Sequence, residues 1–388
     1  MKLAIFATHP VQYHTALWRS LAAVPGLEVH VYYFSDHSVR GGIDPGFGVR
    51  VAWDVPLLQG YEHTFLSRNA DISRAWGVGV KGGEEILSKG GYDWVMLQGY
   101  THKFERQVLR SAKRLEIRVL MRGEFSDLPR GGRARTLLRD LYLGWFYSKV
   151  NAFCAIGETA RVHLINHHIQ PAKITFSPYH VDSNLFRRQA SQYDRRESRA
   201  SLGIGQRDIT FLFSGKFIPR KEPLLLIEAI EKLPDRGNLR LIMLGDGPLH
   251  ERTMVRGKAL LGERLHAPGF VNQSGLGLYF AAADILVLPS KYETWGLVVN
   301  EAMYFGLPAI VSDRVGCLPD LVRLGETGWV FQSGEPQDLA CVIQKIVEEP
   351  HSAKRMGRQA KRLVEDYSTE AARDGILKAL GVFKVAKA

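Results

Sequence analysis

Two lysines that follow a short apolar run are spaced to neutralise a diphosphate. The run Thr210–Phe213 leads into Ser214, Gly215 and Lys216, and Lys221 stands five positions after Lys216. A glycine directly after a buried strand lets a ligand approach the backbone, and ammonium groups supply compact positive charge for phosphate oxygens. The alternative is that Lys221 is an ordinary surface residue at the start of a helix.

Two glutamates eight residues apart, Glu293 and Glu301, could face one ligand from different sides. Both follow the apolar run Ile285–Leu288. Gly296 permits a tight turn before a helix that we expect to begin at Leu297, and the free N–H groups at such a helix start attract anions. Glu301 could instead pair with a lysine on a solvated helix face.

The elements that must position these side chains are short apolar runs that alternate with amphipathic stretches. Uniformly apolar strands separated by helices predict parallel sheets covered on both faces. Ligands of such sheets bind beyond the carboxyl ends of the strands, so the residues just after each run should form the site. The expected strands are Lys2–Ala7, Glu28–Phe34, Trp94–Leu97, Arg118–Met121, Ala152–Ile156 and Ile174–Phe176 in a first series, and Thr210–Phe213, Arg240–Leu244, Leu265–Pro268, Ile285–Leu288 and Ala309–Val311 in a second.

The two series predict two doubly wound α/β domains, which suits a chain of 388 residues. We expect an N-terminal Rossmann-like domain over residues 1–190 and a C-terminal one over 209–365. The polar stretch 191–208 reads as a linker. Residues 366–388 read as a last helix, capped by Ser368, that packs back toward the N-terminal domain.

Composition excludes several classes of protein. No apolar run approaches the ~18 residues that span a bilayer, and the run Leu3–Ala7 is too short for a signal peptide. The chain has an odd number of cysteines, and their spacing is not that of metal ligands: Cys154, Cys317 and Cys341. This favours reduced thiols in the cytoplasm.

Positive charge predicts anionic partners. Lys and Arg number 51 against 40 Asp and Glu, a formal net charge of +11. No nucleic-acid motif accompanies this charge, so we expect no nucleic-acid binding. The stretch Arg130–Val150 combines cations with Tyr142, Trp145, Phe146 and Tyr147, which fits a segment that touches an anionic membrane surface. The alternative is a basic helix whose apolar side packs in the first domain, and both can hold together.

These motifs, in this order, resemble the family-4 glycosyltransferases of the GT-B fold, most strongly from Phe211 to Val322. The resemblance implies an acceptor-binding and a nucleotide-sugar-binding Rossmann-like domain that face each other across a cleft. Lys216 and Lys221 match residues that bind the donor diphosphate. The E-x7-E motif of the family maps onto Glu293, which would contact the transferred sugar, and Glu301, which would hold the ribose hydroxyls.

Further donor-binding positions follow from the same resemblance. The backbone amides of Gly296, Leu297 and Val298 would face the phosphates, and Phe270 and Val271 would flank the base. The remaining matched positions in the donor half are Gly215, Gly245, Thr294, Gly316 and Asp320. Pro178–Phe186 resembles the segment that ends the first domain of the family.

The first domain fits the family pattern less well. The loop after its first strand reads Thr8–His14 rather than glycine-rich, and His9 or Gln12 could approach the phosphates or the acceptor. His9 could equally be a buried histidine. The histidine that relatives carry after a later strand is absent, and Arg122, Glu124 or His102 could take its place.

The resemblance implies a retaining glycosyltransferase that moves a sugar from a nucleotide diphosphate sugar, with UDP favoured, to a hydroxyl of a glycan or lipid-linked acceptor. We expect a role in cell-surface polysaccharide or glycolipid synthesis, in the cytoplasm or at the inner face of the membrane. No dicarboxylate stands where it would hold a metal over the diphosphate, so we expect no metal and no cofactor. The alternatives are a non-hydrolysing sugar-nucleotide epimerase or a phosphorylase of the same fold, or a catalytically silent sugar-nucleotide-binding module.

Overall fold

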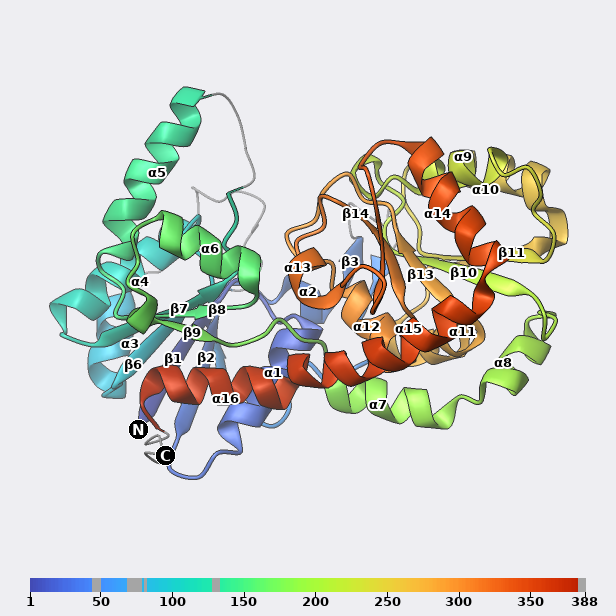
Figure 1. Ribbon diagram of the computed structural model, residues 1–388. Coiled ribbons are helices and arrows are strands. Elements are labelled where there is room, and N and C mark those ends of the chain that lie inside the picture. Colours follow the sequence, from blue (N-terminus) through green and yellow to red (C-terminus); the bar gives the residue numbers. More distant parts are fainter. Residues whose placement is uncertain (44–49, 68–78, 80–81, 128–132, 383–388) are drawn as a thin grey trace, which may run out of the picture. The chain divides into compact units, whose positions relative to one another are not determined.

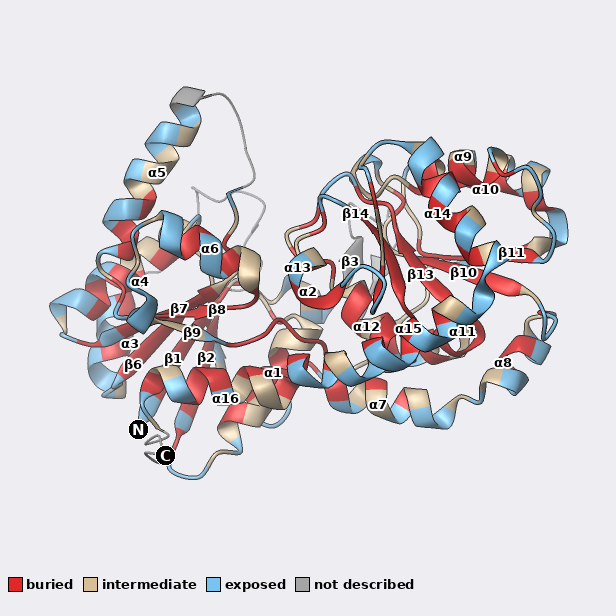
Figure 2. Cartoon of the chain, in the orientation of Figure 1, coloured by how far each residue is buried: buried red, intermediate tan, exposed pale blue. Residues whose placement is uncertain are grey.

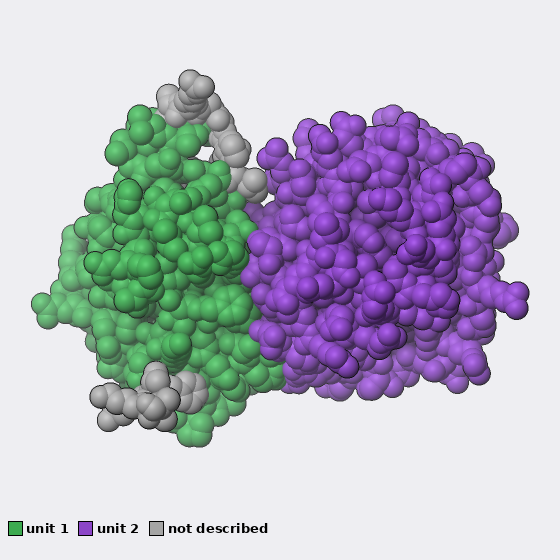
Figure 3. All heavy atoms as spheres, in the orientation of Figure 1, with its two compact units in different colours: residues 1–40, 56–180, 368–388 green, residues 41–55, 181–367 purple. Residues whose placement is uncertain are grey.

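The computed structural model describes residues 1–43, 50–67, 79, 82–127 and 133–382. The chain divides into two compact units, coloured separately in Figure 3. Unit 1 comprises residues 1–40, 56–180 and 368–388, and unit 2 comprises residues 41–55 and 181–367. Cys154, Cys317 and Cys341 are free thiols.

Unit 1 is built on a seven-stranded parallel sheet whose strands lie in the order β5-β2-β1-β6-β7-β8-β9. The strand order reverses between β1 and β6, so the carboxyl ends of these two strands border a switch point. The strands are β1 (Lys2–Ala7), β2 (Glu28–Tyr33), β5 (Glu62–Phe65), β6 (Trp94–Leu97), β7 (Arg118–Gly123), β8 (Ala152–Ala155) and β9 (Ile174–Phe176).

Helices cover both faces of this sheet, with α4 and α6 on one side and α16 on the other (Figure 1). Ser368 caps α16, because its Oγ accepts a hydrogen bond from the Ala371 N–H at 3.2 Å. Ile376 and Leu377 of α16 share a buried core with Leu3 and Trp18. The helices are α1 (Gln12–Ala22), α2 (His37–Arg40), α3 (Gly83–Gly90), α4 (Lys103–Arg114), α5 (Arg133–Tyr147), α6 (Glu158–Asn166) and α16 (Thr369–Leu380). The last residues of the expected terminal helix, 383–388, lie outside the described part.

Unit 2 is built on a six-stranded parallel sheet in the order β12-β11-β10-β13-β14-β15. Counted within the unit this is the 3-2-1-4-5-6 order of a Rossmann sheet, with its switch point between β10 and β13. The strands are β10 (Ile209–Ser214), β11 (Leu239–Leu244), β12 (Leu265–Gly269), β13 (Ile285–Leu288), β14 (Ala309–Ser312) and β15 (Gly328–Phe331).

The central strands β10, β11, β13 and β14 are almost wholly buried because helices lie over both sheet faces, whereas the edge strands β12 and β15 are partly exposed (Figure 2). One core joins the sheet to α9, α10 and α14 through residues such as Phe213, Ile227 and Ile343. The helices are α7 (Ser183–Gln192), α8 (Arg195–Ser201), α9 (Pro223–Glu231), α10 (His250–Leu261), α11 (Leu276–Ala282), α12 (Val298–Tyr304), α13 (Leu318–Leu321), α14 (Pro336–Glu348) and α15 (Pro350–Leu363).

Residues 191–208, expected as a linker, instead contain helix α8 and form part of unit 2. Arg199 of this helix is fully buried. Its guanidinium donates to the carbonyls of Gly205 and Asp208 at 2.6 Å, to the carbonyl of Ala282 at 2.9 Å and to the Asp284 carboxylate at 3.1 Å. The sequence of this stretch is polar because the largest residue that it buries, Arg199, is a cation that donates hydrogen bonds to several backbone carbonyls.

The segment 41–55 also groups with unit 2, although it precedes most of unit 1 in the sequence. Within this segment β3 (Gly42–Ile43) pairs antiparallel with β4 (Arg50–Val51). Asn272 Nδ2 donates to the Ala52 carbonyl at 2.7 Å, and the Ser274 N–H donates to Asp54 at 3.1 Å. None of the helices in the described residues combines the length and apolar character that a bilayer span requires.

We expect Arg199→Ala to lower the free energy of unfolding of unit 2 by about 3–5 kcal/mol, because it leaves buried carbonyls and the Asp284 carboxylate short of a donor. Urea unfolding of the full chain measures this loss. Arg196→Ala, an exposed neighbour on the same helix, is the matched control and should change stability by less than ~0.5 kcal/mol. Equal losses in both variants would contradict the structural role of Arg199.

Candidate functional site

Basic and acidic side chains meet at the switch point of unit 2. Lys221 follows β10, and its Nζ lies 2.5 Å from Glu293 Oε1 in the loop after β13. Arg220 Nη1 lies 2.8 Å from the other carboxylate oxygen, Oε2. Ser290 Oγ donates to Oε1 at 2.8 Å. One buried carboxylate therefore holds two cations together, and the three charged groups carry a net charge of +1.

The loop that carries Glu293 is fixed by its backbone. The Glu293 N–H donates to the Arg314 carbonyl, and its carbonyl accepts from the Gly316 N–H, each at 3.1 Å. A Cβ on Gly316 would lie 2.1 Å from the Thr294 carbonyl oxygen, so only glycine allows this approach. This explains locally why the Gly316 position requires glycine.

The electrostatics of Glu293 favour its charged form. Burial by itself would raise the pKa of this carboxyl, but Lys221, Arg220 and the Ser290 hydroxyl outweigh burial and hold the pKa below its ordinary value. Glu293 is therefore a carboxylate at neutral pH, able to accept hydrogen bonds from hydroxyl groups.

Glycines bring three strand ends of unit 2 into close contact. The Gly215 N–H donates to the Leu244 carbonyl at 2.9 Å, and the Gly245 N–H donates to the Gly269 carbonyl at 2.8 Å. A Cβ on Gly245 would lie 1.9 Å from the Gly215 oxygen, and Gly245 has φ +127°. Lys216 follows Gly215 directly and is partly buried. The aliphatic part of Lys221 lies beside Gly215, and its Cε would be 3.9 Å from a Cβ built on this glycine. Because these turn residues are glycines, they carry no side chain that could cover the backbone there.

Glu301 lies on α12 within the electrostatic reach of Lys221. Burial of its carboxyl raises the pKa to about 7, against the opposing effects of Lys221 and a hydrogen bond with Gln273. Glu301 thus titrates near neutral pH, unlike Glu293. The cation Lys221 influences both members of the glutamate pair.

Helix α12 begins at Val298, one residue later than expected, with Leu297 at the N-cap position. Gly296 precedes it with φ +108°. The buried Trp295 indole donates to Asn300 Oδ1 at 2.8 Å, which fixes the turn against the helix. The first backbone N–H groups of a helix have no partner within the helix. The N–H groups of this turn are therefore of the kind that can donate hydrogen bonds to a phosphate.

The remaining donor-half candidates fall into two groups. Phe270, Val271 and Thr294 are partly buried residues next to strand β12 or the Glu293 loop. Asp320 is buried, and the Tyr367 hydroxyl donates to its Oδ1 at 3.0 Å, which gives it a structural contact at the end of unit 2.

In unit 1, histidines gather near the switch point between β1 and β6. His9 follows β1, and its ring lies 4.4 Å from that of His37, which follows β2. Burial, reinforced by His37 and His102, lowers the pKa of His9 to about 4, so this imidazole is neutral at pH 7. His102 is the N-cap of α4, and its N–H donates to Glu105 Oε2 at 2.9 Å. Gln12 is the partly exposed first residue of α1.

Two of the three candidates for the missing family histidine lie at the end of β7, and they differ in exposure. Arg122 is buried and donates to Ser177 Oγ at 2.9 Å and to the Pro178 carbonyl at 2.8 Å, so it holds the core of unit 1. Glu124, two residues on, is exposed, and its Oε1 accepts from the Tyr179 hydroxyl at 2.6 Å. Of the two residues at the β7 end, Glu124 is the one available to a ligand.

Sequence reasoning overlooked Arg220, Ser290, Gln273 and Tyr179. Arg220 and Ser290 share the carboxylate of Glu293, Gln273 bonds Glu301, and Tyr179 holds Glu124. Only Arg220 carried a usable signal, because it adjoins Lys221 in a short turn after the strand. The others are polar residues whose partners are distant in sequence.

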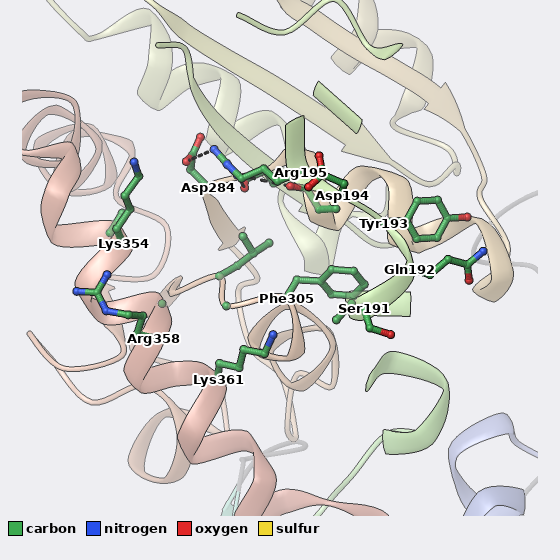
Figure 4. A pocket seen from close by; sticks show the side chains of 17 residues that line it. Ser191, Gln192, Tyr193, Asp194, Arg195, Asp284, Phe305, Lys354, Arg358 and Lys361 are labelled. Atoms are coloured by element: carbon green, nitrogen blue, oxygen red, sulfur yellow. Dashed lines mark hydrogen bonds and ion pairs between the residues drawn. The ribbon is translucent and has the colours of Figure 1, made fainter. Parts of the chain in front are cut away.

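Unit 2 also has a hollow of about 620 Å³ that none of the expected donor residues lines. Figure 4 shows it between α8, the α12–β14 turn and α15, with Lys354, Arg358 and Lys361 along α15 and Arg195 paired with Asp284 at 2.7 Å. The size of a hollow therefore does not identify the site in this unit.

Sequence comparisons find a match between the second half of the chain and a known family. Residues 194–363 match the family model of "Glycosyl transferases group 1". A D-inositol 3-phosphate glycosyltransferase of Streptomyces griseus is 32% identical over 210 residues, which cover 51% of this chain and 44% of that relative. The sulfoquinovosyl transferase SQD2 of Arabidopsis thaliana is 30% identical over 196 residues, covering 50% and 36%. The matches thus span less than half of these curated relatives. The match to this family thus covers residues 194–363, which are less than half of the chain.

Structural comparisons cover the whole chain and establish the fold as GT-B. A sucrose-phosphate synthase of Thermosynechococcus elongatus superposes with a TM-score of 0.72 at 20% identity, over 100% of both chains. The Anabaena protein HepE in complex with UDP and glucose superposes with a TM-score of 0.71 at 16% identity, over 99% and 100%. The expected fold class, two Rossmann-like domains, is confirmed.

We expect Glu301→Gln and Glu293→Gln to change stability with opposite signs. The folded-state pKa of Glu301 is raised, so its contribution to stability is present below the ordinary pKa and lost as the pH rises through about 7. Glutamine mimics the protonated form, so Glu301→Gln should stabilise the chain at pH 8 by ~1–3 kcal/mol and by less at pH 5. Urea unfolding at the two pH values measures both.

Glu293→Gln is the matched comparison. The pKa of Glu293 is lowered, so its contribution is present above the ordinary carboxyl pKa and lost as the pH falls through the lowered value. This variant should therefore be less stable than the parent at pH 8. A gain from Glu301→Gln that is the same at pH 5 and pH 8 would refute the titration assigned to Glu301.

Proposed function

We propose that this chain is a glycosyltransferase that moves a sugar from a nucleotide diphosphate sugar, UDP-linked in our preferred assignment, to a hydroxyl group with retention at the anomeric carbon. The observation that carries the proposal is the Lys221–Glu293–Arg220 cluster at the switch point of unit 2, inside the segment that matches the family model. The structurally similar HepE forms a complex with UDP and glucose, which supports a uridine nucleotide as the first one to test.

The proposed mechanism depends on positive charge near the departing diphosphate. Cleavage of the sugar–phosphate bond moves an electron pair onto the phosphate oxygen and leaves positive charge on the sugar ring. Lys216, Lys221 and the backbone amides of Gly296–Val298 would stabilise the diphosphate without reorganising during the reaction. Arg220 would add a third cation, already oriented by the Glu293 carboxylate.

The two glutamates would have separate roles. Glu293 is charged at neutral pH and would accept hydrogen bonds from hydroxyls of the transferred sugar, while its charge favours the developing ring cation. Glu301 would hold the ribose hydroxyls in its carboxylate form. Because the pKa of Glu301 is about 7, the affinity for the donor should fall as the pH drops below neutrality.

We assign no metal to the diphosphate, because the cations of the chain itself fill that electrostatic role. We also propose that the acceptor is a glycan or lipid-linked sugar that serves cell-surface polysaccharide or glycolipid synthesis, with the enzyme acting from the cytoplasm. Within unit 1, the exposed Glu124 and the neutral His9 are the side chains best suited to approach an acceptor hydroxyl; Gln12 and His102 are the further candidates.

Helix α5 supports a membrane-associated acceptor. Leu143, Phe146 and Tyr147 are buried in unit 1, whereas Leu137, Leu138 and Leu141 are 62%, 68% and 64% exposed. Both interpretations of the basic stretch therefore apply to α5. One side of the helix packs in the core of unit 1, and the other side presents exposed apolar side chains. Trp145 adds an aromatic ring 5.2 Å from the Lys149 ammonium. We propose that this face lies on anionic lipid.

Lys216→Ala and Lys221→Ala should each slow sugar transfer by 10²-fold or more, because each removes a charge aimed at the leaving diphosphate. Product release from a panel of nucleotide sugars, with UDP-glucose first, measures the rate. Lys258→Ala, an exposed lysine on α10, is the matched control. Near-parental rates in both variants would contradict the donor-site assignment.

Chelation tests the absence of a catalytic metal in the same assay. Activity should not require added Mg²⁺ or Mn²⁺ after chelation by EDTA, and loss that only Mg²⁺ or Mn²⁺ restores would contradict the proposal. Turnover of donor without any acceptor would favour the epimerase alternative instead. Binding without turnover by the parent chain would favour a silent sugar-nucleotide-binding module.

The triple variant Leu137→Ser, Leu138→Ser and Leu141→Ser should bind phosphatidylglycerol vesicles about tenfold more weakly or worse, because it removes the apolar face of α5. Vesicle flotation measures the binding, and binding of the parent chain should weaken as salt is added. Val255→Ser, which changes an equally exposed side chain on α10 (68% exposed), is the control. Indifference of the parent chain to lipid charge would count against the membrane proposal.

A further inference from the structure

A second cluster of ligating side chains lies in unit 1, at the end of strand β7. Asp127, His163 and His167 each offer one ligand atom, and these atoms lie within 4.8 Å of one another. His163 Nδ1 is 2.5 Å from Asp127 Oδ1, and His167 Nε2 is 3.7 Å from the same oxygen. None of the three residues belongs to the donor or acceptor groups considered above.

The two histidines share one helical face by their spacing. His163 lies on α6 and His167 is its C-cap residue, four positions later. Residues four apart lie one above the other on a helix, so both imidazoles can bind the same ion. Their rings lie 4.4 Å apart. The HxxxH spacing therefore supplies two nitrogen ligands from one short element.

A fourth ligand is available from helix α5. Asp140 Oδ1 lies 4.0 Å from His167 Nε2 and also accepts a hydrogen bond from Arg139 Nε at 3.1 Å, which an ion would replace. Tetrahedral zinc with ligands at 2.0–2.2 Å places its donor atoms roughly 3.3 Å apart. The separations of 3.7 and 4.0 Å are close to this value, and the partly exposed Asp127 can move back from His163 by the fraction of an ångström that an ion needs.

Further contacts orient the ligands as they do in metal sites. The Tyr147 hydroxyl lies 3.0 Å from His163 Nε2, the ring nitrogen that faces away from Asp127. Asn166 Nδ2 donates to Asp127 Oδ2 at 3.2 Å, the oxygen that does not face the histidines. The Phe125 ring stacks on the His163 ring at 6.0 Å and 7°. Such outer contacts fix imidazole orientation and carboxylate geometry.

We propose that Asp127, His163 and His167, with Asp140 as the fourth ligand, bind a Zn²⁺ ion. Nitrogen and carboxylate ligands in this number suit zinc better than Mg²⁺ or Ca²⁺, which prefer all-oxygen sites. Four protein ligands fill the tetrahedral coordination shell and leave no position for a substrate or a water, so the ion would have a structural rather than a catalytic role. It would tie the segment after β7 to α5 and α6.

The proton balance of binding is simple. Without the ion, the neutral His163 ring donates from Nδ1 to Asp127 and accepts at Nε2 from the Tyr147 hydroxyl. With zinc on Nδ1, the ring hydrogen shifts to Nε2, and Tyr147 becomes the acceptor. No proton leaves the site, and the carboxylates of Asp127 and Asp140 neutralise the dication.

The test uses the full chain without a histidine tag, stripped with a chelator and titrated with Co²⁺ as a spectroscopic probe. Tetrahedral binding should give visible absorption that saturates at one ion per chain and is displaced by one equivalent of Zn²⁺. His167→Gln and Asp127→Asn should each weaken binding by more than ~100-fold, and Tyr147→Phe by about 10–100-fold. His168→Asn changes the exposed neighbouring histidine and should leave the absorption unchanged.

The outcomes separate a metal site from a plain hydrogen-bonded pair. No saturable absorption in the parent chain, or the same absorption in His167→Gln and Asp127→Asn, would overturn the proposal. His167 and Asp127 are not core residues, so these two variants avoid the folding loss that the buried His163 could cause. The readout is independent of sugar transfer, so it holds whether or not the proposed activity is found.

Discussion

The charged cluster of unit 2 depends on one buried carboxylate that keeps two cations in place. Lys221 and Arg220 would repel each other if they were brought together alone, and Glu293 between them removes that repulsion while leaving an excess positive charge. The same two cations overcome the burial of Glu293 and keep it ionised. The carboxylate and the two cations therefore stabilise each other's charged forms. A diphosphate would meet a preorganised positive site rather than two mobile side chains.

The strand order of the sheet decides which residues can form this cluster. Lys221 follows β10 and Glu293 follows β13, which are far apart in the sequence but adjacent in the sheet. Helices leave these two strands in opposite directions at the switch point, so side chains there are not covered. The glycines at 215, 245 and 316 then let backbone segments pack without side chains between them. The charged cluster is thus a consequence of topology as much as of residue type.

The parts of the fold and of the candidate site that depend on local sequence patterns could be predicted, whereas the parts that depend on contacts between distant residues could not. The buried strands were predictable because a continuous apolar run needs no partner to be recognised. Strand β5 was missed because Glu62–Phe65 alternates polar and apolar residues, and β15 was missed because Gly328–Phe331 is short and begins with a glycine. Lys216, Lys221, Glu293 and Glu301 stood out by spacing. Arg199, Gln273 and Tyr179 did not, because their partners lie far away in the chain and polar residues give no periodic signal.

The two units differ in how they treat charge. In unit 2 two cations keep the pKa of Glu293 below its ordinary value, an arrangement that would suit an anionic ligand. In unit 1 burial lowers the pKa of His9 to about 4 and of His180 to about 3, so these imidazoles are neutral hydrogen-bonding groups at pH 7. A neutral imidazole can orient a hydroxyl group without attracting a competing anion. This difference supports the proposal of a polyanionic donor on unit 2 and of an acceptor hydroxyl on unit 1, where Glu124 is an exposed carboxylate at the end of β7.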